Sequence, residues 1–479
     1  MNVKFLKKIL TFGLIVFAIA ANATVKPASI FTDHMVLQQQ SNVAIWGWAK
    51  PSVKVKIITS WNKENYSITT DQKGKWKVKV ATPSAGGPYN IEFNDGEKLI
   101  LSDILIGEVW FCGGQSNMEL PMKGYKGQPN IGSNEAILKS KNPNIRLYTV
   151  PRSSITERQE NSKPSQWKLS EPEVVANFSA TAYYFGTLLN EILDVPVGII
   201  NDSYSGSSIE AWMSPEDLKS FPEIKIPSKG DSIKEVSRTP TTLYNGMLYP
   251  VIGYSVKGAI WYQGESNYER PDQYESLFPA MVSSWRKNWD NGEFPFYYAQ
   301  IAPYNYAQLA PFHKGGKYNS AFLRDAQRKS LSKISNSAMA VLMDIGEENM
   351  IHPSKKKQGG ERLAYLALAK TYGIKGFSAT SPLYESITIE KNEAVVKFKD
   401  VPNGLTSFSK ELSLFEIAGA DKKFYPAKAV IKGSSINVSS EQVKNPVAVR
   451  YAFNDFIVGD LFGNEGLPVS SFRTDNWDN

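Results

Sequence analysis

The spacing of apolar residues divides the chain into three stretches, and the first contains short alternating runs. Over 43–48, 53–58 and 76–80, apolar residues mostly alternate with polar ones, and turn residues such as the Gly-Gly-Pro run at 86–88 separate the runs. Alternation with a period of two buries one face of a strand. Short strands between turns are typical of a β-sandwich, so we predict an N-terminal β-sandwich region over 24–102.

The second stretch alternates strand-like apolar runs with residues at helical spacing. Apolar residues over 185–192 share one helix face, with Ser179 as a candidate N-cap. Strands are predicted at 104–111, 195–201, 256–261, 296–301 and 338–343, and further helices at 277–285, 322–334 and 361–372. Because strands that alternate with helices form parallel sheets covered on both faces, we predict an α/β domain over 103–375.

The third stretch, 376–479, returns to short apolar runs between turns and predicts a C-terminal β-sandwich region. The runs lie at 386–390, 394–398, 412–417, 435–438 and 447–451. Two arrangements are open: this region either pairs with the N-terminal strands or forms a sandwich of its own. The chain has 479 residues, more than one hydrophobic core usually supports, which agrees with a division into several domains.

Residues 1–23 have the layout of a secretory signal peptide. Three lysines within the first eight residues precede an apolar run over 9–20. Ala21-Asn22-Ala23 matches a signal-peptidase site. The apolar run is shorter than the roughly 20 residues that a membrane span needs. We therefore predict cleavage after Ala23 and an exported protein without a membrane anchor.

The composition of the chain limits which classes of partner and which cellular compartment are predicted. The formal net charge is +7, but the basic residues are dispersed, and the run Lys355-Lys356-Lys357 is typical of a solvated helix face, so nucleic acid is not a predicted partner. The single cysteine, Cys112, permits no internal disulfide, which fits a bacterial periplasm better than a disulfide-rich extracellular module. Since no histidine or cysteine pattern has metal-ligand spacing, neither a metal nor a cofactor is predicted. The oligomeric state stays open.

The predicted strand at 104–111 leads into Gly113-Gly114-Gln115-Ser116-Asn117-Met118, which has the layout of a turn that presents a nucleophile. Open α/β sheets place ligand sites at the carboxyl ends of their strands. Glycines permit a sharp turn and a close approach of substrate to the main chain. Met118 occupies the last glycine position of the Gly-x-Ser-x-Gly elbow, so the motif differs from that of the α/β-hydrolases.

A serine nucleophile requires a base within hydrogen-bonding reach, and the chain contains only three histidines. His34 lies in the N-terminal β region and His313 in a glycine-bearing loop. His352 follows the predicted strand that ends at Asp344 and precedes a predicted helix, which places it near the sheet edge expected to carry Ser116. We therefore predict His352 as the general base.

Three motif blocks occur in order along the chain: Gly114-Gln115-Ser116-Asn117-Met118, Trp261-Tyr262-Gln263-Gly264-Glu265-Ser266-Asn267 and Ile351-His352-Pro353. They resemble the blocks of SGNH-type carbohydrate esterases, above all the sialate O-acetylesterases, with acetyl xylan esterases as relatives. The likeness extends over nearly the whole mature chain. It implies an α/β fold with an SGNH-hydrolase-like parallel sheet flanked by helices, and additional N- and C-terminal β-sandwich regions.

The resemblance also implies roles for individual residues. Ser116 would be the nucleophile and His352 the base. Gly206 would donate a backbone N–H to the oxyanion beside that of Ser116, and Gln263 would donate a side-chain N–H. Ser205 stands where the family often has a second glycine. Gln115 and Asn267, which belong to the first and second motif blocks, would contact the substrate.

The chain departs from the SGNH pattern at the acid that orients the base. Many of these enzymes place an aspartate three residues before the histidine, and this chain has Asn349 there. An amide cannot stabilise an imidazolium as a carboxylate does. Glu265 is the first candidate for this acid, because related esterases carry a glutamate in the same Gln-Gly-Glu block. The alternatives are Asp344, then Glu347 and Glu348, or a dyad without an acid.

These observations predict a periplasmic serine esterase that removes O-acetyl groups from sugars, most of all from sialic acid, through an acetyl-enzyme on Ser116. The alternatives are an acetyl xylan esterase and a non-catalytic carbohydrate-binding protein on an esterase fold. The carboxylate of sialic acid requires a cationic or hydrogen-bonding pocket. Candidates for that pocket are Arg270, His313, Lys314, Lys317 and Arg324, and candidates for stacking on a sugar face are Tyr262, Tyr268 and Tyr304.

Overall fold

The computed structural model describes residues 25–310, 312–313 and 315–477. The signal peptide predicted over 1–23 lies outside these residues. Within the described ranges, none of the helices has the length and hydrophobicity needed to span a membrane.

The N-terminal region forms two β-sheets around a shared core, as the alternating pattern predicts. Trp76 of one sheet packs against Phe93 of the other, with ring centroids 5.7 Å apart. The first sheet contains β1 (Lys26–Pro27), β3 (Asn42–Trp48) and β6 (Lys75–Ala81). The second contains β2 (Val36–Gln38), β4 (Lys54–Thr59), β5 (Asn65–Thr69), β7 (Gly86–Asn94) and the first half of β8 (Lys98–Gly114).

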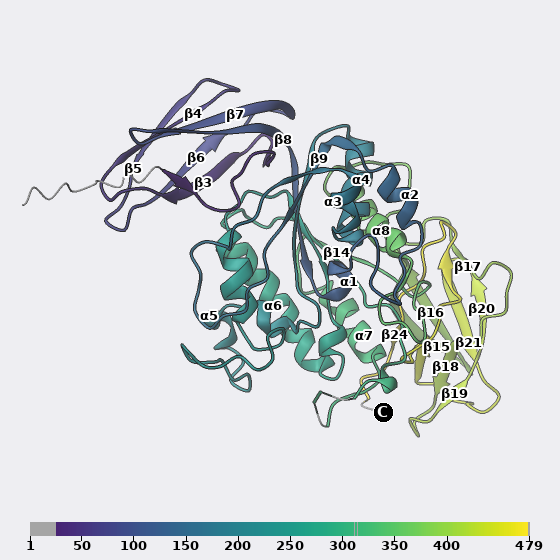
Figure 1. Ribbon diagram of the computed structural model, residues 1–479. Coiled ribbons are helices and arrows are strands. Elements are labelled where there is room, and N and C mark those ends of the chain that lie inside the picture. The colour runs from purple at the N-terminus through teal and green to yellow at the C-terminus, as the bar shows by residue number, and fades with distance from the viewer. Residues whose placement is uncertain (1–24, 311, 314, 478–479) are drawn as a thin grey trace, which may run out of the picture.

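Strand β8 continues from this region into the central sheet. Its first half pairs antiparallel with β7, and its second half pairs parallel with β11 and β12 on either side. The division predicted between residues 102 and 103 therefore falls inside one continuous strand (Figure 1). Beside it, Asp103 accepts hydrogen bonds from Arg146 and bonds to His34 at 2.6 Å, so His34 has a structural role far from the motif blocks.

The central sheet has the order β10-β9-β11-β8-β12-β13-β14, and all neighbours are parallel except the edge strand β10. The remaining bounds are β9 (Asn142–Thr149), β10 (Lys168–Ser170), β11 (Val197–Ser203), β12 (Gly258–Tyr262), β13 (Phe296–Ala299) and β14 (Ser337–Ala340). The α/β class is thus confirmed. The predicted strand over 338–343 ends early, at Ala340, because Val341 to Met343 are buried in a loop rather than paired in the sheet.

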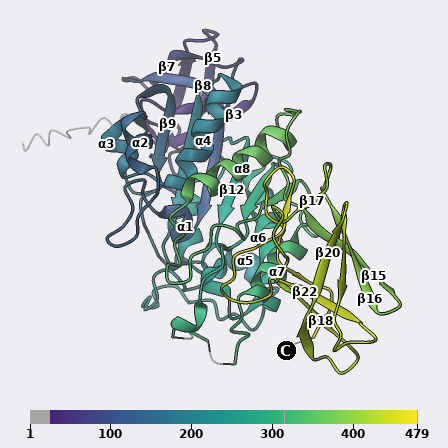
Figure 2. The same cartoon turned by 90° about the vertical axis from the view of Figure 1, so that its right-hand side faces the viewer.

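Helices cover both faces of this sheet (Figures 1 and 2). On one face α4 (Ala180–Leu193) and α8 (Lys356–Lys370) pack on Trp110 and Cys112 of β8. The side chain of Ser179 accepts a hydrogen bond from the backbone N–H of Ala182, which confirms it as the N-cap of α4. On the other face lie α6 (Pro271–Trp289) and α7 (Ala321–Ser330). Shorter helical segments are α1 (Ser116–Glu119), α2 (Ser133–Leu138), α3 (Pro172–Ala176), α5 (Pro215–Leu218), η1 (Ile209–Trp212), η2 (Tyr244–Leu248), η3 (Tyr249–Val251), η4 (Glu265–Asn267) and η5 (Tyr306–Gln308).

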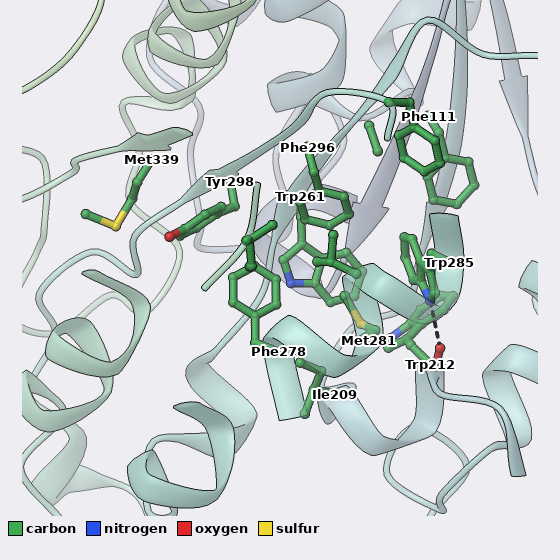
Figure 3. Packing of buried hydrophobic residues seen from close by; sticks show 14 of the residues in the cluster. Phe111, Ile209, Trp212, Trp261, Phe278, Met281, Trp285, Phe296, Tyr298 and Met339 are labelled. Carbon is green, nitrogen blue, oxygen red and sulfur yellow. Dashed lines mark hydrogen bonds between the residues drawn. The ribbon is translucent and has the colours of Figure 1, made fainter. Parts of the chain in front are cut away.

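An aromatic cluster packs between the sheet and α6. Figure 3 shows Trp212 and Trp285 together on one side of Trp261 of β12. The ring of Trp261 lies edge-on to both, with centroids 6.1 and 5.3 Å away. The indole N–H of Trp285 donates to the backbone carbonyl of Trp212 at 3.1 Å. This cluster fixes the loop that follows β11 against the strand that leads to the second motif block.

The C-terminal strands form sheets of their own, at the opposite end of the molecule from the N-terminal region (Figures 1 and 2). The arrangement in which the two β regions pair with each other is therefore wrong. The bounds are β15 (Leu383–Glu390), β16 (Glu393–Lys399), β17 (Leu405–Thr406), β18 (Phe415–Ala418), β19 (Phe424–Pro426), β20 (Lys428–Lys432), β21 (Ser435–Ser439), β22 (Ala448–Tyr451), β23 (Phe462–Gly463) and β24 (Phe472–Arg473).

Candidate active site

The first two motif blocks and the Gly206 loop meet at the carboxyl ends of three neighbouring strands. Gly114, the last residue of β8, lies in register with Ser203 of β11 on one side and Tyr262 of β12 on the other. Ser116, Gly206 and Gln263 follow these three residues within a few positions. The parallel register therefore brings together loops that are far apart along the chain.

The turn that presents Ser116 requires glycine at position 114. Gly114 has φ +143°, and a Cβ built there would lie 2.2 Å from the carbonyl oxygen of Tyr262. Ser116 then begins α1 and is 7 % exposed. Within the described ranges, no side chain bonds to its hydroxyl. The hydroxyl is therefore not committed to another side chain.

The loop that carries Gly206 is held by the carboxylate of Glu119, the residue that follows the first block. Gly206 has φ +73°, a conformation that favours glycine. The preceding residue, Ser205, donates from its backbone N–H to Glu119 at 2.7 Å and also from its hydroxyl. Arg152 donates to the other oxygen of Glu119 and lies over the ring of Tyr204. This clamp positions the backbone of Gly206 beside the Ser116 turn.

Gln263, Gln115 and Asn267 contact these loops through their side chains. All three are buried. Gln263 donates to the carbonyl of Ser207 at 3.0 Å and to Asn267 at 2.7 Å. Asn267 also accepts from the N–H of Ile209, and Gln115 accepts from two N–H groups of the loop after β12. These contacts hold the loops together, while Oε1 of Gln263 has no partner among the described residues. The oxyanion and substrate contacts predicted for the three side chains stay predictions.

His352 lies in the loop before α8, with its imidazole held by an amide. Its Nδ1 is 2.6 Å from Oε1 of Gln128, and its ring lies edge-on to Tyr125. Since an amide oxygen can only accept, Nδ1 carries the proton and Nε2 has the free lone pair. Burial, with a smaller contribution from the charge of Lys356, lowers the pKa of His352 to about 4. The ring is therefore neutral at neutral pH, the form that a general base requires.

The carboxylates considered as the orienting acid are engaged elsewhere. Asp344 accepts two hydrogen bonds from Arg362, both 2.6 Å long. Glu347 accepts from the backbone and the hydroxyl of Ser354, and Glu348 is exposed. Asn349 accepts from Gln308. In the part of the chain that the structure describes, no carboxylate bonds to the His352 ring.

Glu265 takes part in a buried relay through Asn117. Its Oε1 accepts from Nδ2 of Asn117 at 2.5 Å, and the same amide group donates to the carbonyl of Ile351 at 3.1 Å. Lys356 donates to Oδ1 of Asn117. Burial raises the pKa of Glu265 and lowers that of Lys356 to about 7. The relay joins all three motif blocks through Asn117, the residue after Ser116, and the motifs alone do not predict this connection.

The residues predicted for a carboxylate pocket are mostly committed to other contacts. Arg324 is fully buried and bonds to the carbonyl oxygens of Asn454 and Asp455, so it anchors the C-terminal region. Lys317 pairs with Asp272, and Arg270 pairs with Glu210 at 2.5 Å. Lys314 lies outside the described residues. The predicted stacking residues Tyr262, Tyr268 and Tyr304 are all buried, with exposures of 2, 6 and 7 %.

Comparisons with known proteins agree on one family. Residues 106–369 match the family model described as carbohydrate esterase, sialic acid-specific acetylesterase. The human (Homo sapiens) sialate O-acetylesterase is 27 % identical over 469 residues, which cover 89 % of this chain and 87 % of the relative. The rat (Rattus norvegicus) sialate O-acetylesterase is 28 % identical over 431 residues, 76 % of each chain. The crystal structure of a carbohydrate acetylesterase from Xanthomonas citri superposes with a TM-score of 0.85 at 32 % identity, covering 95 % of this chain and 100 % of that one.

Proposed function

The chain belongs to the carbohydrate esterase family of sialic acid-specific acetylesterases, and on that premise we propose that it is a serine esterase that removes O-acetyl groups from sialic acid. One observation carries the assignment of the site. The hydroxyl of Ser116, which no other side chain among the described residues engages, stands on a glycine-dependent turn at the carboxyl end of the central strand β8, where the loops of the neighbouring strands converge. The proposal includes the SGNH-type arrangement that the motif blocks imply.

The proposed reaction proceeds through an acetyl-enzyme. Oγ of Ser116 attacks the acetyl carbon while Nε2 of His352 takes the hydroxyl proton. The negative charge on the carbonyl oxygen is stabilised by the backbone N–H groups of Ser116 and Gly206. When the tetrahedral intermediate collapses, the bond to the sugar oxygen breaks and His352 returns the proton to that oxygen. Water then attacks the acetyl group by the same route and releases acetate.

The loop contacts assign supporting roles to the other predicted residues. In this proposal Gln128 orients His352 through Nδ1, the position that an acid holds in a Ser-His-Asp triad. In the proposal, Gln263 and Asn267 hold the loop after Gly206. This support directs the backbone N–H of Gly206 at the oxyanion. The proposal also includes export, since the layout of residues 1–23 predicts cleavage after Ala23 and activity in the bacterial periplasm.

The substrate assignment is tested by comparing two acetylated carbohydrates under the same conditions. Acetate release is measured as kcat/KM on sialic acid O-acetylated on its glycerol side chain and on acetylated xylo-oligosaccharides. The proposal predicts a higher kcat/KM on the sialic acid ester. A clear preference for the xylan fragments would contradict sialic acid as the substrate and leave the esterase mechanism in place. Binding of glycans without acetate release would favour a carbohydrate-binding protein.

A further inference from the structure

A cavity of about 480 Å³ with both charged and apolar lining lies beside the loop that carries Gly206. Its walls come from the loop after β11, the segment around Arg238, the start of α6 and the loop at Phe312. The cavity is distinct from the hydroxyl of Ser116 and from the buried relay, and none of the predicted catalytic residues lines it. The cavity shares the loop after β11 with Gly206, because Ser208 and Glu210 of this loop line it.

The wall that contains Arg238 is attached to the proposed catalytic loops. A Cβ on Gly206 would lie 3.5 Å from the hydroxyl oxygen of Ser237, the residue before Arg238. Nη1 of Arg238 donates to the carbonyl of Ser266 at 3.5 Å, and the N–H of Ser266 donates to Gln115, next to Ser116. The guanidinium is thus positioned by the same loops that would hold the acetyl group.

Arg238 differs from the neighbouring arginine in forming no ion pair within the described ranges, although Glu269, Glu235 and Glu210 stabilise its charge at longer range. Arg270 pairs with the buried carboxylate of Glu210. The other buried carboxylate, Glu269, accepts from the backbone N–H groups of Phe312 and His313 at 2.6 and 2.7 Å. Among the residues that the structure describes, no carboxylate forms an ion pair with Arg238. Glu223 and Glu235 also line the cavity, but both are exposed at its solvent side.

The surroundings of Arg238 leave the edge of its guanidinium available. One face of the group lies over the ring of Phe312, with 4.1 Å between the central carbon and the ring centroid. Stacking of this kind covers the face of an arginine but not the N–H groups in its plane. The pKa of Arg238 is lowered, because burial removes water from its charge and the nearby carboxylates compensate for this loss only in part. A planar carboxylate would accept two parallel hydrogen bonds from this guanidinium.

We propose that Arg238, stacked on Phe312, binds the carboxylate of an acidic O-acetylated sugar while the acetyl group lies at Ser116. The proposal rests on the proposed esterase function and deepens it, since it assigns the group that distinguishes a sugar acid from a neutral sugar. Xylan fragments without an acidic substituent have no carboxylate to offer this subsite. Arg238 would therefore determine specificity.

The test uses two substrates that differ only in charge. One is sialic acid O-acetylated on its glycerol side chain, and the other is its C1 carboxamide. The preference is the ratio of their kcat/KM values for acetate release, measured for wild type, Arg238→Gln, Arg238→Lys and the control Lys219→Gln. The control removes one exposed positive charge outside the cavity. Thermal unfolding of each variant shows whether the fold is intact.

We expect wild type to prefer the acid and Arg238→Gln to reduce this preference by about tenfold to a hundredfold, the range for hydrogen bonds to charged groups. Arg238→Lys should retain part of the preference, because lysine keeps the positive charge but cannot donate two parallel hydrogen bonds to a carboxylate. Lys219→Gln should keep all of it. Equal losses on acid and carboxamide would show a structural role for Arg238 and overturn the proposal, as would an unchanged preference in Arg238→Gln.

Direct binding separates failure of the subsite from failure of the esterase assignment. Calorimetric titration of Ser116→Ala with deacetylated sialic acid, with and without Arg238→Gln, measures the carboxylate subsite without turnover. Acetate release from neutral acetylated sugars with no preference for the acid would overturn the subsite and leave an esterase. No acetate release from any sugar would overturn the proposed function, and the titration would still decide whether Arg238 binds the carboxylate.

Discussion

At the scale of single residues, the imidazole of His352 is the group whose ionisation governs the proposed chemistry. Burial lowers its pKa to about 4 in the free enzyme, below the ordinary value of about 6.5. The base form is the neutral ring, so activity is present above this pKa and is lost as the pH falls through it. We expect the acid limb of kcat/KM for an activated acetyl ester to lie near pH 4. An acid limb near pH 6.5 would contradict the buried, neutral imidazole.

Gln128 offers a direct test of how the base is oriented. Gln128→Glu would place a carboxylate beside Nδ1 of His352, which favours the imidazolium and should move the acid limb of kcat/KM to higher pH by about one unit or more. Gln128→Leu removes the acceptor and should lower kcat by about tenfold, since one hydrogen bond that orients the ring is lost. The measurement is the pH profile of both variants. Profiles that coincide with wild type would show that Gln128 does not orient the base.

The residues of this site differ in how far the sequence predicts them. Ser116 and His352 were predicted because a glycine turn after a strand and a histidine before a helix are local patterns. Gln128 has no such pattern, since it reaches His352 across 224 positions of the chain from an irregular loop. Glu265 was predicted as a partner of the base from its block, whereas its carboxylate bonds to Asn117. Side-chain direction within a loop depends on tertiary packing, which neither periodicity nor motif spacing encodes.

At the scale of elements, the end of β8 depends on the absence of a side chain at Gly114. Gly114→Ala adds a Cβ 2.2 Å from the carbonyl of Tyr262 at a φ of +143°. Gly96→Ala is a matched control, because Gly96 has φ +122° with nothing within 4 Å. Backbone strain alone costs about 1–3 kcal/mol, so we expect a loss of this size in the control and a larger loss in Gly114→Ala. Denaturant unfolding measures both, and equal losses would mean that the close approach of β12 is unimportant.

The relay of Glu265, Asn117 and Lys356 couples the first two blocks to the start of α8. If the two charged residues act through Asn117 as a unit, Glu265→Gln and Lys356→Met should not have additive effects on the free energy of unfolding. We expect a coupling of about 1 kcal/mol or more in the double-mutant cycle, together with lower turnover in both single variants. Additive effects on unfolding would show that the two side chains act independently.

At the scale of the whole molecule, the predicted α/β domain and its flanking β regions correspond to the observed layers, but their connection does not follow from the pattern. Strand β8 serves two sheets because its residues stay buried without a break from Ile104 to Gly114, although Gly107 and Glu108 interrupt the apolar run. The C-terminal region is attached through buried groups of α7, where Asp325 pairs with Arg473 at 3.1 Å. Contacts between distant segments of this kind decide the packing of domains, and the alternation of apolar residues reports only that each strand has a buried face.

The central claim is that Ser116 carries the acetyl group of a sialic acid ester. Acetate release from O-acetylated sialic acid, compared between wild type and a folded Ser116→Ala variant, tests it most directly. We predict measurable turnover by wild type and a loss of about 10⁴-fold or more in the variant, as for removal of a catalytic serine elsewhere. Turnover retained by Ser116→Ala, or no acetate release by wild type, would contradict the assignment.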